Sequence, residues 1–160
     1  MTLILVMDND HAIGSGGGLL CSLPEDMKHF RETTKGAAVV MGRKTYLSFP
    51  KRPLPGRRNI VLSRSVETIA GAEVFNDINK LLGYLKTLDE PVFVIGGGEI
   101  YRELEQYCDE ALITRVYENF GGDVFFHDIE HDRSWKLAES SPVIETDGRI
   151  IRFLRFVKGV

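Results

Sequence analysis

The chain has 160 residues, of which 43% are hydrophobic and 27% are charged. This is enough apolar material for the core of one ordinary globular domain, so a disordered chain is excluded. Lys and Arg total 20 against 23 Asp and Glu, which gives a formal net charge of −3. Because this charge does not favour polyanions, we expect no nucleic-acid partner and no binding to an anionic membrane.

The two cysteines, Cys21 and Cys108, are too few and too far apart in the sequence for a disulfide framework. A reducing compartment, the cytoplasm, fits this cysteine usage best. The apolar run at residues 3–7 ends at Asp8 and has no basic leader, so it predicts a buried strand rather than a signal peptide or a membrane span. Without a repeat or a linker, residues 1–160 are expected to form a single domain.

Short apolar or β-branched runs alternate with helical patterns along most of the chain. The predicted strands are residues 3–7, 38–41, 59–62, 92–95 and 111–116. This alternation predicts an α/β fold with a mostly parallel central sheet and flanking helices. Residues 135–139 and 149–157 lie on either side of the turn signal Asp147-Gly148 and predict an antiparallel C-terminal edge hairpin. Residues 9–22 and 117–134 are predicted to be loops.

Glycines and cations follow several of these strands, where ligands of open α/β sheets gather. The run Gly96-Gly97-Gly98 precedes a helical pattern at residues 99–107 and predicts a pyrophosphate cradle. The run Gly42-Arg43-Lys44-Thr45 opens another helix, and Ser63-Arg64 ends a third strand with side chains suited to a phosphate monoester. An NAD site would carry an acidic residue at the strand end, so these cations favour NADP.

The segment at residues 14–19 superficially matches the dinucleotide fingerprint G-x-G-x-x-G, but its last position is Leu19 and Pro24 follows soon after. We therefore predict a glycine-rich lid over the first strand rather than a phosphate site.

A helix start is predicted by Ser22 and Glu25 at capping-box spacing with Pro24 in the first turn, and its end is predicted at Gly36. On a wheel of about 100° per residue, Asp26 falls on the apolar side, together with Leu23, Met27, Phe30 and Thr34. A carboxylate among apolar side chains loses hydration unless it is hydrogen-bonded. A satisfied core group is one explanation of Asp26, but the adjacent lid and cradle favour a carboxylate that faces a ligand.

The segment from His127 to His131 has the H-x-x-E-H spacing of a zinc-peptidase motif. That motif needs a helix, whereas Gly121-Gly122 precedes the segment closely and acidic residues surround it. We therefore expect a solvated acidic loop and no metal site.

The remaining motifs occur in a fixed order along nearly the whole chain. They are Ala12-Ile13-Gly14, Leu23-Pro24-Glu25-Asp26 with Phe30, residues 40–45, 52–63 and 94–101, Thr114, and Gly122-Asp123. One such piece alone is weak, but the ordered series is very specific. On these residues the sequence resembles the dihydrofolate reductase family, in its bacterial form.

The resemblance implies NADPH-dependent reduction of 7,8-dihydrofolate to tetrahydrofolate, with hydride transfer to C6 of the pterin and protonation at N5. It implies a catalytic set of Asp26, which would hold the pterin, Thr114, which would support Asp26, and Tyr101, which would border the nicotinamide. It also implies a cytoplasmic monomer that binds dihydrofolate and antifolate inhibitors and serves one-carbon metabolism.

The resemblance further implies which residues line the two ligands. The implied substrate-binding residues are Ile4, Leu5, Val6, Met27, Phe30, Phe49, Arg52, Leu54, Arg57 and Ile95, of which Arg57 would clamp the glutamate α-carboxylate. The implied cofactor-binding residues are Val6, Ile13, Gly14, Leu19, Gly42, Arg43, Lys44, Thr45, Leu62, Ser63, Arg64, Gly96, Gly97, Gly98, Glu99, Ile100 and Tyr101. The lid would comprise Ser15, Gly16, Gly17, Gly18, Leu20 and Cys21, with Asp123.

The chain departs from the family pattern at the lid, where Cys21 stands in the place of the usual Trp and the Pro usual before that position is missing. This departure predicts a looser lid. Two alternatives stay open: the NADPH-dependent reductase of flavin biosynthesis, and a catalytically inactive dinucleotide-binding module. Asp26 and Arg57 argue against the first alternative, and the combination of Asp26, Thr114 and the glycine cradle argues against the second.

Overall fold

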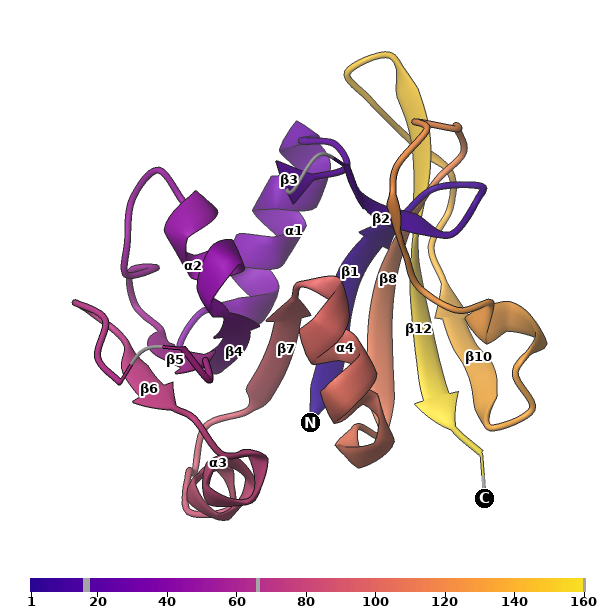
Figure 1. Cartoon of the computed structure of the whole chain (residues 1–160). Coiled ribbons are helices and arrows are strands. Elements are labelled where there is room, and N and C mark those ends of the chain that lie inside the picture. Colours follow the sequence, from indigo (N-terminus) through magenta and orange to yellow (C-terminus); the bar gives the residue numbers. More distant parts are fainter. Residues whose placement is uncertain (16–17, 66, 160) are drawn as a thin grey trace.

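The computed structural model describes residues 1–15, 18–65 and 67–159. The predictions made for Gly16 and Gly17 therefore lie outside the described residues. Figure 1 shows one large twisted sheet with helices packed on it and a second, small sheet at one end.

The larger part of the main sheet is parallel. Its strands are β1 (Thr2–Met7), β4 (Ala38–Gly42), β5 (Arg58–Leu62), β6 (Glu73–Phe75), β7 (Val92–Gly96) and β8 (Glu110–Val116). They lie in the order β8-β1-β7-β4-β5-β6, and every neighbouring pair in this run is parallel. Each of the five predicted strands is present and is one residue longer than predicted. The short edge strand β6 was not predicted, because it has only three residues, all half-buried.

The C-terminal part of the sheet is antiparallel, as predicted. It consists of β10 (Trp135–Ser140), β11 (Ile144–Thr146) and β12 (Arg149–Lys158), and β12 lies between β8 and β10. The turn Asp147-Gly148 has positive φ at both residues, 51° and 74°. It joins β11 to β12 rather than β10 to β12, because the unpredicted strand β11 intervenes.

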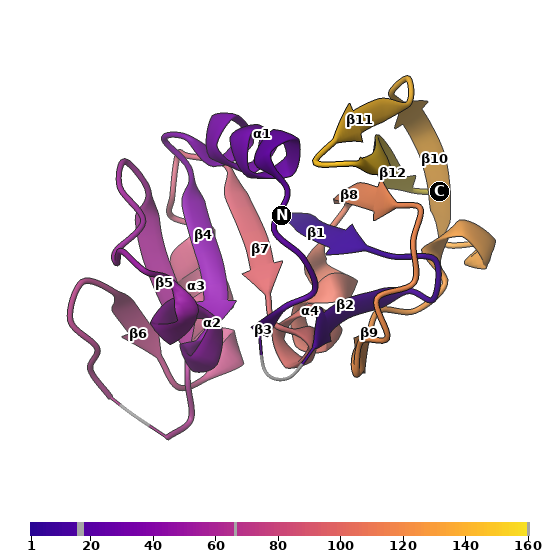
Figure 2. The same cartoon turned by 90° about the horizontal axis from the view of Figure 1, so that it is seen from above.

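Helices cover both faces of the sheet. The helices α1 (Pro24–Thr34) and α2 (Arg43–Ser48) lie on one face. The helices α3 (Ile78–Leu85) and α4 (Gly98–Leu104), with the 3-10 turn η1 (Glu105–Tyr107), lie on the other. Figure 2 shows α1 above the strands and α4 below them. Alternate residues of the buried strands therefore feed two separate apolar cores.

The start of α1 differs from its prediction. Ser22 does not cap the helix: the N-cap residue is Leu23, which makes no side-chain capping bond, and the Ser22 hydroxyl contacts Met27 Sδ at 3.0 Å. The hydroxyl of Thr146, on β11, instead accepts a 3.4 Å hydrogen bond from the backbone N–H of Glu25. A residue far away in the sequence thus replaces the expected local capping box.

The stretches predicted as loops contain a small second sheet. It is built from β2 (Ala12–Ser15), β3 (Gly18–Leu19) and β9 (Val124–Phe125). Asp8, which is fully buried, fixes this region because its carboxylate accepts backbone N–H bonds from Asp10, Ala12 and Phe120 at 2.9 to 3.0 Å. A buried carboxylate with three donors is satisfied, so Asp8 is a structural anchor between the lid and the following loop.

Candidate active site

The carboxyl ends of the central strands meet at one edge of the sheet. Gly42 of β4 pairs with Leu62 of β5, and Met41 pairs with Gly96 of β7. The three predicted phosphate-binding segments, which begin at Gly42, Ser63 and Gly96, therefore lie side by side where the chain leaves the sheet.

The glycines of this edge allow close backbone approach. A Cβ atom on Gly98 would lie 2.6 Å from Val124 Cγ1, so no side chain fits there. A Cβ on Gly97 would lie 3.6 Å from Thr45 Oγ1, and one on Gly42 would lie 3.1 Å from Ile100 Cγ1. The starts of α2 and α4 are thus in contact, and the bare backbone between them fits the pyrophosphate of a dinucleotide.

Tyr101 connects this glycine cradle to β1. Gly96 has a φ of 118°, and a Cβ on it would lie 3.2 Å from the Tyr101 hydroxyl. That hydroxyl donates a 2.7 Å hydrogen bond to the carbonyl oxygen of Ile4. Burial, with a smaller contribution from the charge of Asp26, raises the pKa of Tyr101. The hydroxyl is therefore a permanent donor on the nucleotide side of β1.

The carboxyl group of Asp26 lies on the opposite side of β1, where α1 meets β8. Thr114 Oγ1 donates a 2.5 Å hydrogen bond to Asp26 Oδ1. Burial raises the pKa of Asp26, while the hydrogen bond from Thr114 and the nearby charge of His29 act in the opposite direction. Such a carboxyl, withdrawn from water but held by a hydroxyl, is typical of a ligand-binding or catalytic site.

The predicted substrate-binding side chains divide between the two faces of the sheet. One apolar cluster on the α1 face contains Ile4, Phe30, Phe49, Leu54 and Ile95. Val6 packs in the adjacent cluster around Leu23, and Met27 is 48% exposed. The side chain of Leu5 points the other way, into the core beneath α3 and α4. Leu5 therefore does not join this group through its side chain.

Arg57 lies beside these apolar residues. Its Nη1 donates to Thr34 Oγ1 at 3.2 Å, and its guanidinium carbon lies 5.9 Å from the centroid of the Phe30 ring. Burial, followed by the charge of Arg31, lowers the pKa of Arg57, so this position favours an anion. Arg52 donates to the carbonyl of Leu47 at 2.7 Å and borders a pocket of about 440 Å³.

Asn59 orients the loop that carries Leu54 and Arg57, a role that the sequence did not reveal. Its side chain accepts from the backbone N–H of Leu54 at 2.9 Å and donates to the carbonyls of Leu54 and Arg57, both at 3.0 Å. It is 4% exposed, so these bonds satisfy its amide in the interior.

The third phosphate-binding segment holds an ion pair. Arg64 Nη1 lies 2.9 Å from Glu103 Oε1, on α4. Ser63 is buried, and its hydroxyl lies 3.3 Å from that of Ser65. Arg43 and Lys44 are exposed at the start of α2, and Glu99 is exposed at the start of α4. Glu103 was not predicted, because its partner lies 39 positions away in the sequence.

Of the described lid residues, Ser15 ends β2 and Gly18 begins β3, whereas Leu20 and Cys21 follow β3. Gly14 pairs with Leu19 and Ser15 pairs with Gly18, and Leu19 is 73% exposed. The backbone N–H of Asp123 donates to the carbonyl of Gly14 at 3.0 Å. A Cβ on Gly98 would also lie 3.9 Å from Ile13 Cδ1, so the lid borders the glycine cradle.

Cys21 packs at the base of the lid rather than serving as a nucleophile. It is half-buried against the apolar cluster that contains Leu23 and Val116. Burial and the charge of Asp26 raise the pKa of its thiol to about 11. The thiol is therefore protonated near neutral pH and unreactive.

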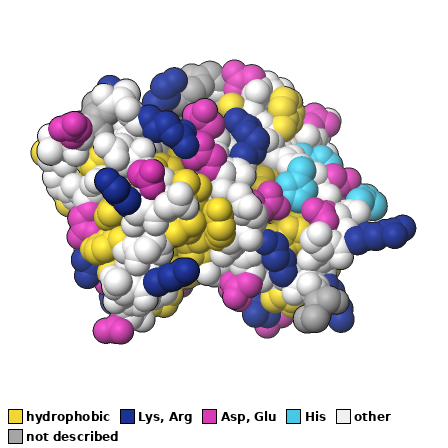
Figure 3. Space-filling view, turned by 60° about the horizontal axis from the view of Figure 1, so that its bottom comes forward, with side chains coloured by type: hydrophobic (Ala, Val, Ile, Leu, Met, Phe, Trp, Pro, Cys, Tyr) yellow, Lys and Arg dark blue, Asp and Glu magenta, His cyan; other side chains and the backbone are white. Residues whose placement is uncertain are grey.

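The H-x-x-E-H segment forms only a single 3-10 turn, η2 (Ile129–His131). His127 contacts Glu105 and lies 3.7 Å from Asp132, whereas His131 lies 2.6 Å from Asp128. The two imidazoles therefore face different carboxylates, and the helix that the peptidase motif needs is not formed. Figure 3 shows histidines among acidic side chains on one part of the surface.

A glycine cradle and several cations lie at the ends of the central strands. A single strand, β1, separates them from the half-buried carboxyl of Asp26. This arrangement defines a nucleotide-dependent oxidoreductase site on an open α/β sheet. A family model described as "Dihydrofolate reductase" matches residues 1–158. The chain belongs to the dihydrofolate reductase family, as the sequence motifs implied.

Individual relatives and a solved structure support the same family membership. The chain is 35% identical to dihydrofolate reductase of Neisseria meningitidis serogroup A over 160 residues, which cover 99% of this chain and 98% of the relative. It is 34% identical to that of Bacillus subtilis over 141 residues, or 88% and 82% of the two chains. A structure of the Enterococcus faecalis enzyme complexed with NADP(H) and RAB-propyl matches with a TM-score of 0.88 and 31% identity, covering 99% of this chain and 96% of that one. The predicted fold class is thereby confirmed.

Proposed function

We propose that this chain reduces 7,8-dihydrofolate to 5,6,7,8-tetrahydrofolate with NADPH, by hydride transfer to C6 of the pterin and protonation at N5. The observation that carries this proposal is the bond between Thr114 and Asp26, across one strand from the glycine cradle. It provides a fixed carboxyl for a flat, nitrogen-rich ring beside a site for a dinucleotide.

Asp26 binds and orients the pterin. Its ionised carboxylate accepts paired hydrogen bonds from the 2-amino group and the ring N–H, and its negative charge favours the protonated form of N5. Thr114 keeps Oδ1 in position for this contact. A solvent water admitted at the lid delivers the proton, because the carboxylate itself is committed to the other edge of the ring.

NADPH supplies the hydride when it is bound. The residues around the starts of α2 and α4 would hold its pyrophosphate, namely Arg43, Lys44, Thr45, Gly96, Gly97 and Gly98. Arg43, Ser63 and Arg64 would bind the 2′-phosphate, and Tyr101 would border the nicotinamide. Because Tyr101 also donates to the carbonyl of Ile4, it would fix β1 beside the place where the two rings meet. Holding two flat rings face to face away from water supplies much of the catalysis.

Arg57 determines specificity for the acidic tail of the substrate. Its cationic group lies beside Phe30, in reach of the apolar cluster that surrounds the pterin and benzoyl rings. A bidentate pair with the α-carboxylate of the glutamate suits a guanidinium already withdrawn from water.

Residues 1–160 work as one domain and as a monomer in the cytoplasm. No helix among the described residues is long and apolar enough to cross a membrane. Antifolate inhibitors bind through Asp26, since a protonated diaminopyrimidine presents the same paired donors to a carboxylate. The product supplies one-carbon metabolism, and neither nucleic acid nor a membrane takes part.

The experiment follows NADPH oxidation by the purified chain with dihydrofolate as the only acceptor, and quantifies tetrahydrofolate by chromatography. Equal amounts of NADPH consumed and tetrahydrofolate formed support the proposal. Oxidation that requires a phosphorylated ribityl pyrimidine instead would assign the chain to the flavin pathway. Binding of NADPH without turnover of either substrate would identify an inactive binding module.

A further inference from the structure

The side chain expected to recognise the 2′-phosphate is already engaged by a carboxylate. Arg64 Nη1 lies 2.9 Å from Glu103 Oε1, and the Arg64 side chain is 64% exposed against 26% for Glu103. The second oxygen, Glu103 Oε2, is buried and has no hydrogen-bond partner among the described residues. This carboxylate is therefore incompletely satisfied and directed at the cation of the site.

Other charges around Arg64 are also acidic. The pKa of Arg64 is raised chiefly by its hydrogen bond and charge interaction with Glu103, and further by the charges of Glu99 and Asp77. Glu99 and Glu103 are one helical turn apart on α4, so they share a face of that helix. The charges that raise the pKa of Arg64 are thus those of three carboxylates, Glu103, Glu99 and Asp77, and these oppose the approach of a phosphate dianion.

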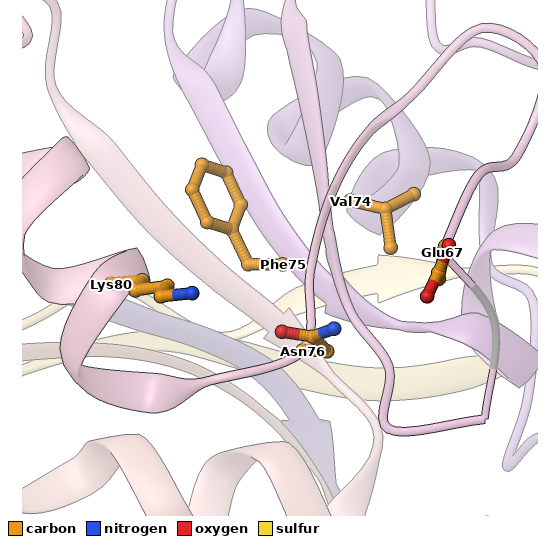
Figure 4. Close-up of a pocket in the computed structure, with 5 residues that line it drawn as sticks. All are labelled: Glu67, Val74, Phe75, Asn76 and Lys80. Carbon is orange, nitrogen blue, oxygen red and sulfur yellow. The ribbon is translucent and has the colours of Figure 1, made fainter.

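The neighbouring surface is open to a ligand. The backbone N–H of Ser63 donates to the carbonyl of Phe75 at 2.9 Å, which places the segment around Arg64 against the end of β6. A pocket of about 270 Å³ adjoins that strand, and Figure 4 shows Lys80 at one end of its lining, Glu67 at the other and Asn76 between them. The Arg64 side chain is itself 64% exposed, so it can turn from Glu103 towards an incoming phosphate without crossing packed core.

We propose that Glu103 is a specificity-determining residue of the dinucleotide site, because its carboxylate competes with the 2′-phosphate for Arg64. This inference rests on the proposed placement of Arg64 at the 2′-phosphate. A dinucleotide without that phosphate leaves the ion pair intact. A 2′-phosphorylated one must displace or share Arg64 and approach Glu103 Oε2. Glu103 therefore lowers the preference for the phosphorylated ligand below what Arg64 alone would provide.

The test measures binding to the free protein by calorimetry, with adenosine 2′,5′-bisphosphate and ADP as probes. Glu103→Gln keeps the shape of the side chain and removes its charge. The expected result is binding of the bisphosphate that is roughly 2- to 5-fold tighter, within the range for one exposed charge pair, with the affinity for ADP unchanged. Unchanged or weaker binding of the bisphosphate would overturn the inference, since Glu103 would then be neutral or would orient Arg64 for the phosphate.

Two further variants separate the possible failures. Glu110→Gln is the matched control, because Glu110 Oε2 pairs with Arg155 Nη2 at 3.0 Å at the antiparallel edge of the sheet. It should leave both probes unaffected. Arg64→Leu should weaken the bisphosphate about tenfold or more, the loss of a charge-assisted contact, and spare ADP. If Arg64→Leu has no effect, the placement of Arg64 itself is wrong and the inference fails with it. If only Glu103→Gln has no effect, the placement stands and the inference alone is wrong.

Discussion

The hydroxyl of Thr114 donates a 2.5 Å hydrogen bond to Asp26 Oδ1 and thereby ties the first turn of α1 to strand β8. Asp26 is the acid that the sequence left without a local structural role. Its partner is 88 positions away, so the pair exists only in the folded chain. The hydrogen bond fixes the orientation of the proposed catalytic carboxyl and counteracts the burial that raises its pKa.

Thr114→Val should weaken dihydrofolate binding by roughly tenfold, the value of one hydrogen bond to a charged group. The carboxylate loses its donor, so the pKa of Asp26 rises further and less of the ionised form is present. Equilibrium titration with dihydrofolate and NMR titration of the Asp26 carboxyl measure the two effects. Thr114→Ser keeps the hydroxyl and serves as the control. Equal losses in the Val and Ser variants would show that packing, not the hydrogen bond, is responsible.

Asp26→Asn should stabilise the ligand-free protein at neutral pH. Burial holds the pKa of Asp26 above its ordinary value of 3.8, so the folded state disfavours the ionised carboxyl. The stability of the folded wild type is therefore lowered increasingly as pH rises from about 3.8 through the raised pKa. Below this window the carboxyl is protonated in both the folded and the unfolded state, and this loss of stability vanishes. We expect a gain on the order of 1 kcal/mol, or about 3 °C in Tm. Thermal unfolding at several pH values would refute this if the gain were largest in acid.

Arg57→Lys should raise KM for dihydrofolate by roughly tenfold, because Lys cannot make the bidentate contact with a carboxylate. A dihydropterin without the glutamate tail should be reduced by the variant and the wild type with similar kcat/KM. Steady-state kinetics with the two substrates separates the effects. If both substrates suffer equally, Arg57 acts through the loop that Asn59 holds and not through the tail.

Gly98→Ala should impair the glycine cradle. The added Cβ would lie 2.6 Å from Val124 Cγ1, so we expect a loss of about 1 to 3 kcal/mol of stability from overpacking and weaker NADPH binding. Gly83→Ala is the matched control, because nothing lies within 4 Å of its added Cβ and it is inside α3. That variant should be neutral or stabilised by up to about 1 kcal/mol. Similar NADPH affinities for both variants would argue against a backbone cradle at Gly98.

Local patterns predict the elements of this fold well, because the buried strands are apolar runs and α1 has a clear period. The same period placed Asp26 on the apolar side of its helix. Side chains alternate between the two faces of a strand, so Leu5 of β1 points away from the face that carries Ile4 and Val6. The period of two in the sequence already indicates this, whereas the family resemblance placed all three residues together at the substrate.

Other features depend on contacts between distant segments. The cap that Thr146 supplies to α1 and the pairing of Glu103 with Arg64 join residues 121 and 39 positions apart. No local signal marks Thr146 as a cap. The spacing of Glu99 and Glu103 does indicate an acidic helix face, but only the packing of α4 against β7 and β4 brings that face to Arg64.

The most direct test of the account compares wild type and Asp26→Asn in turnover of dihydrofolate and in NADPH binding. We predict that kcat/KM for dihydrofolate falls by about a hundredfold or more, the usual contribution of a general acid–base group. NADPH affinity, measured by fluorescence on the same samples, should change by less than about twofold, since Asp26 and the glycine cradle lie on opposite sides of β1. Turnover by Asp26→Asn at the wild-type rate would contradict the account, because the carboxylate would then have no part in reduction of the pterin.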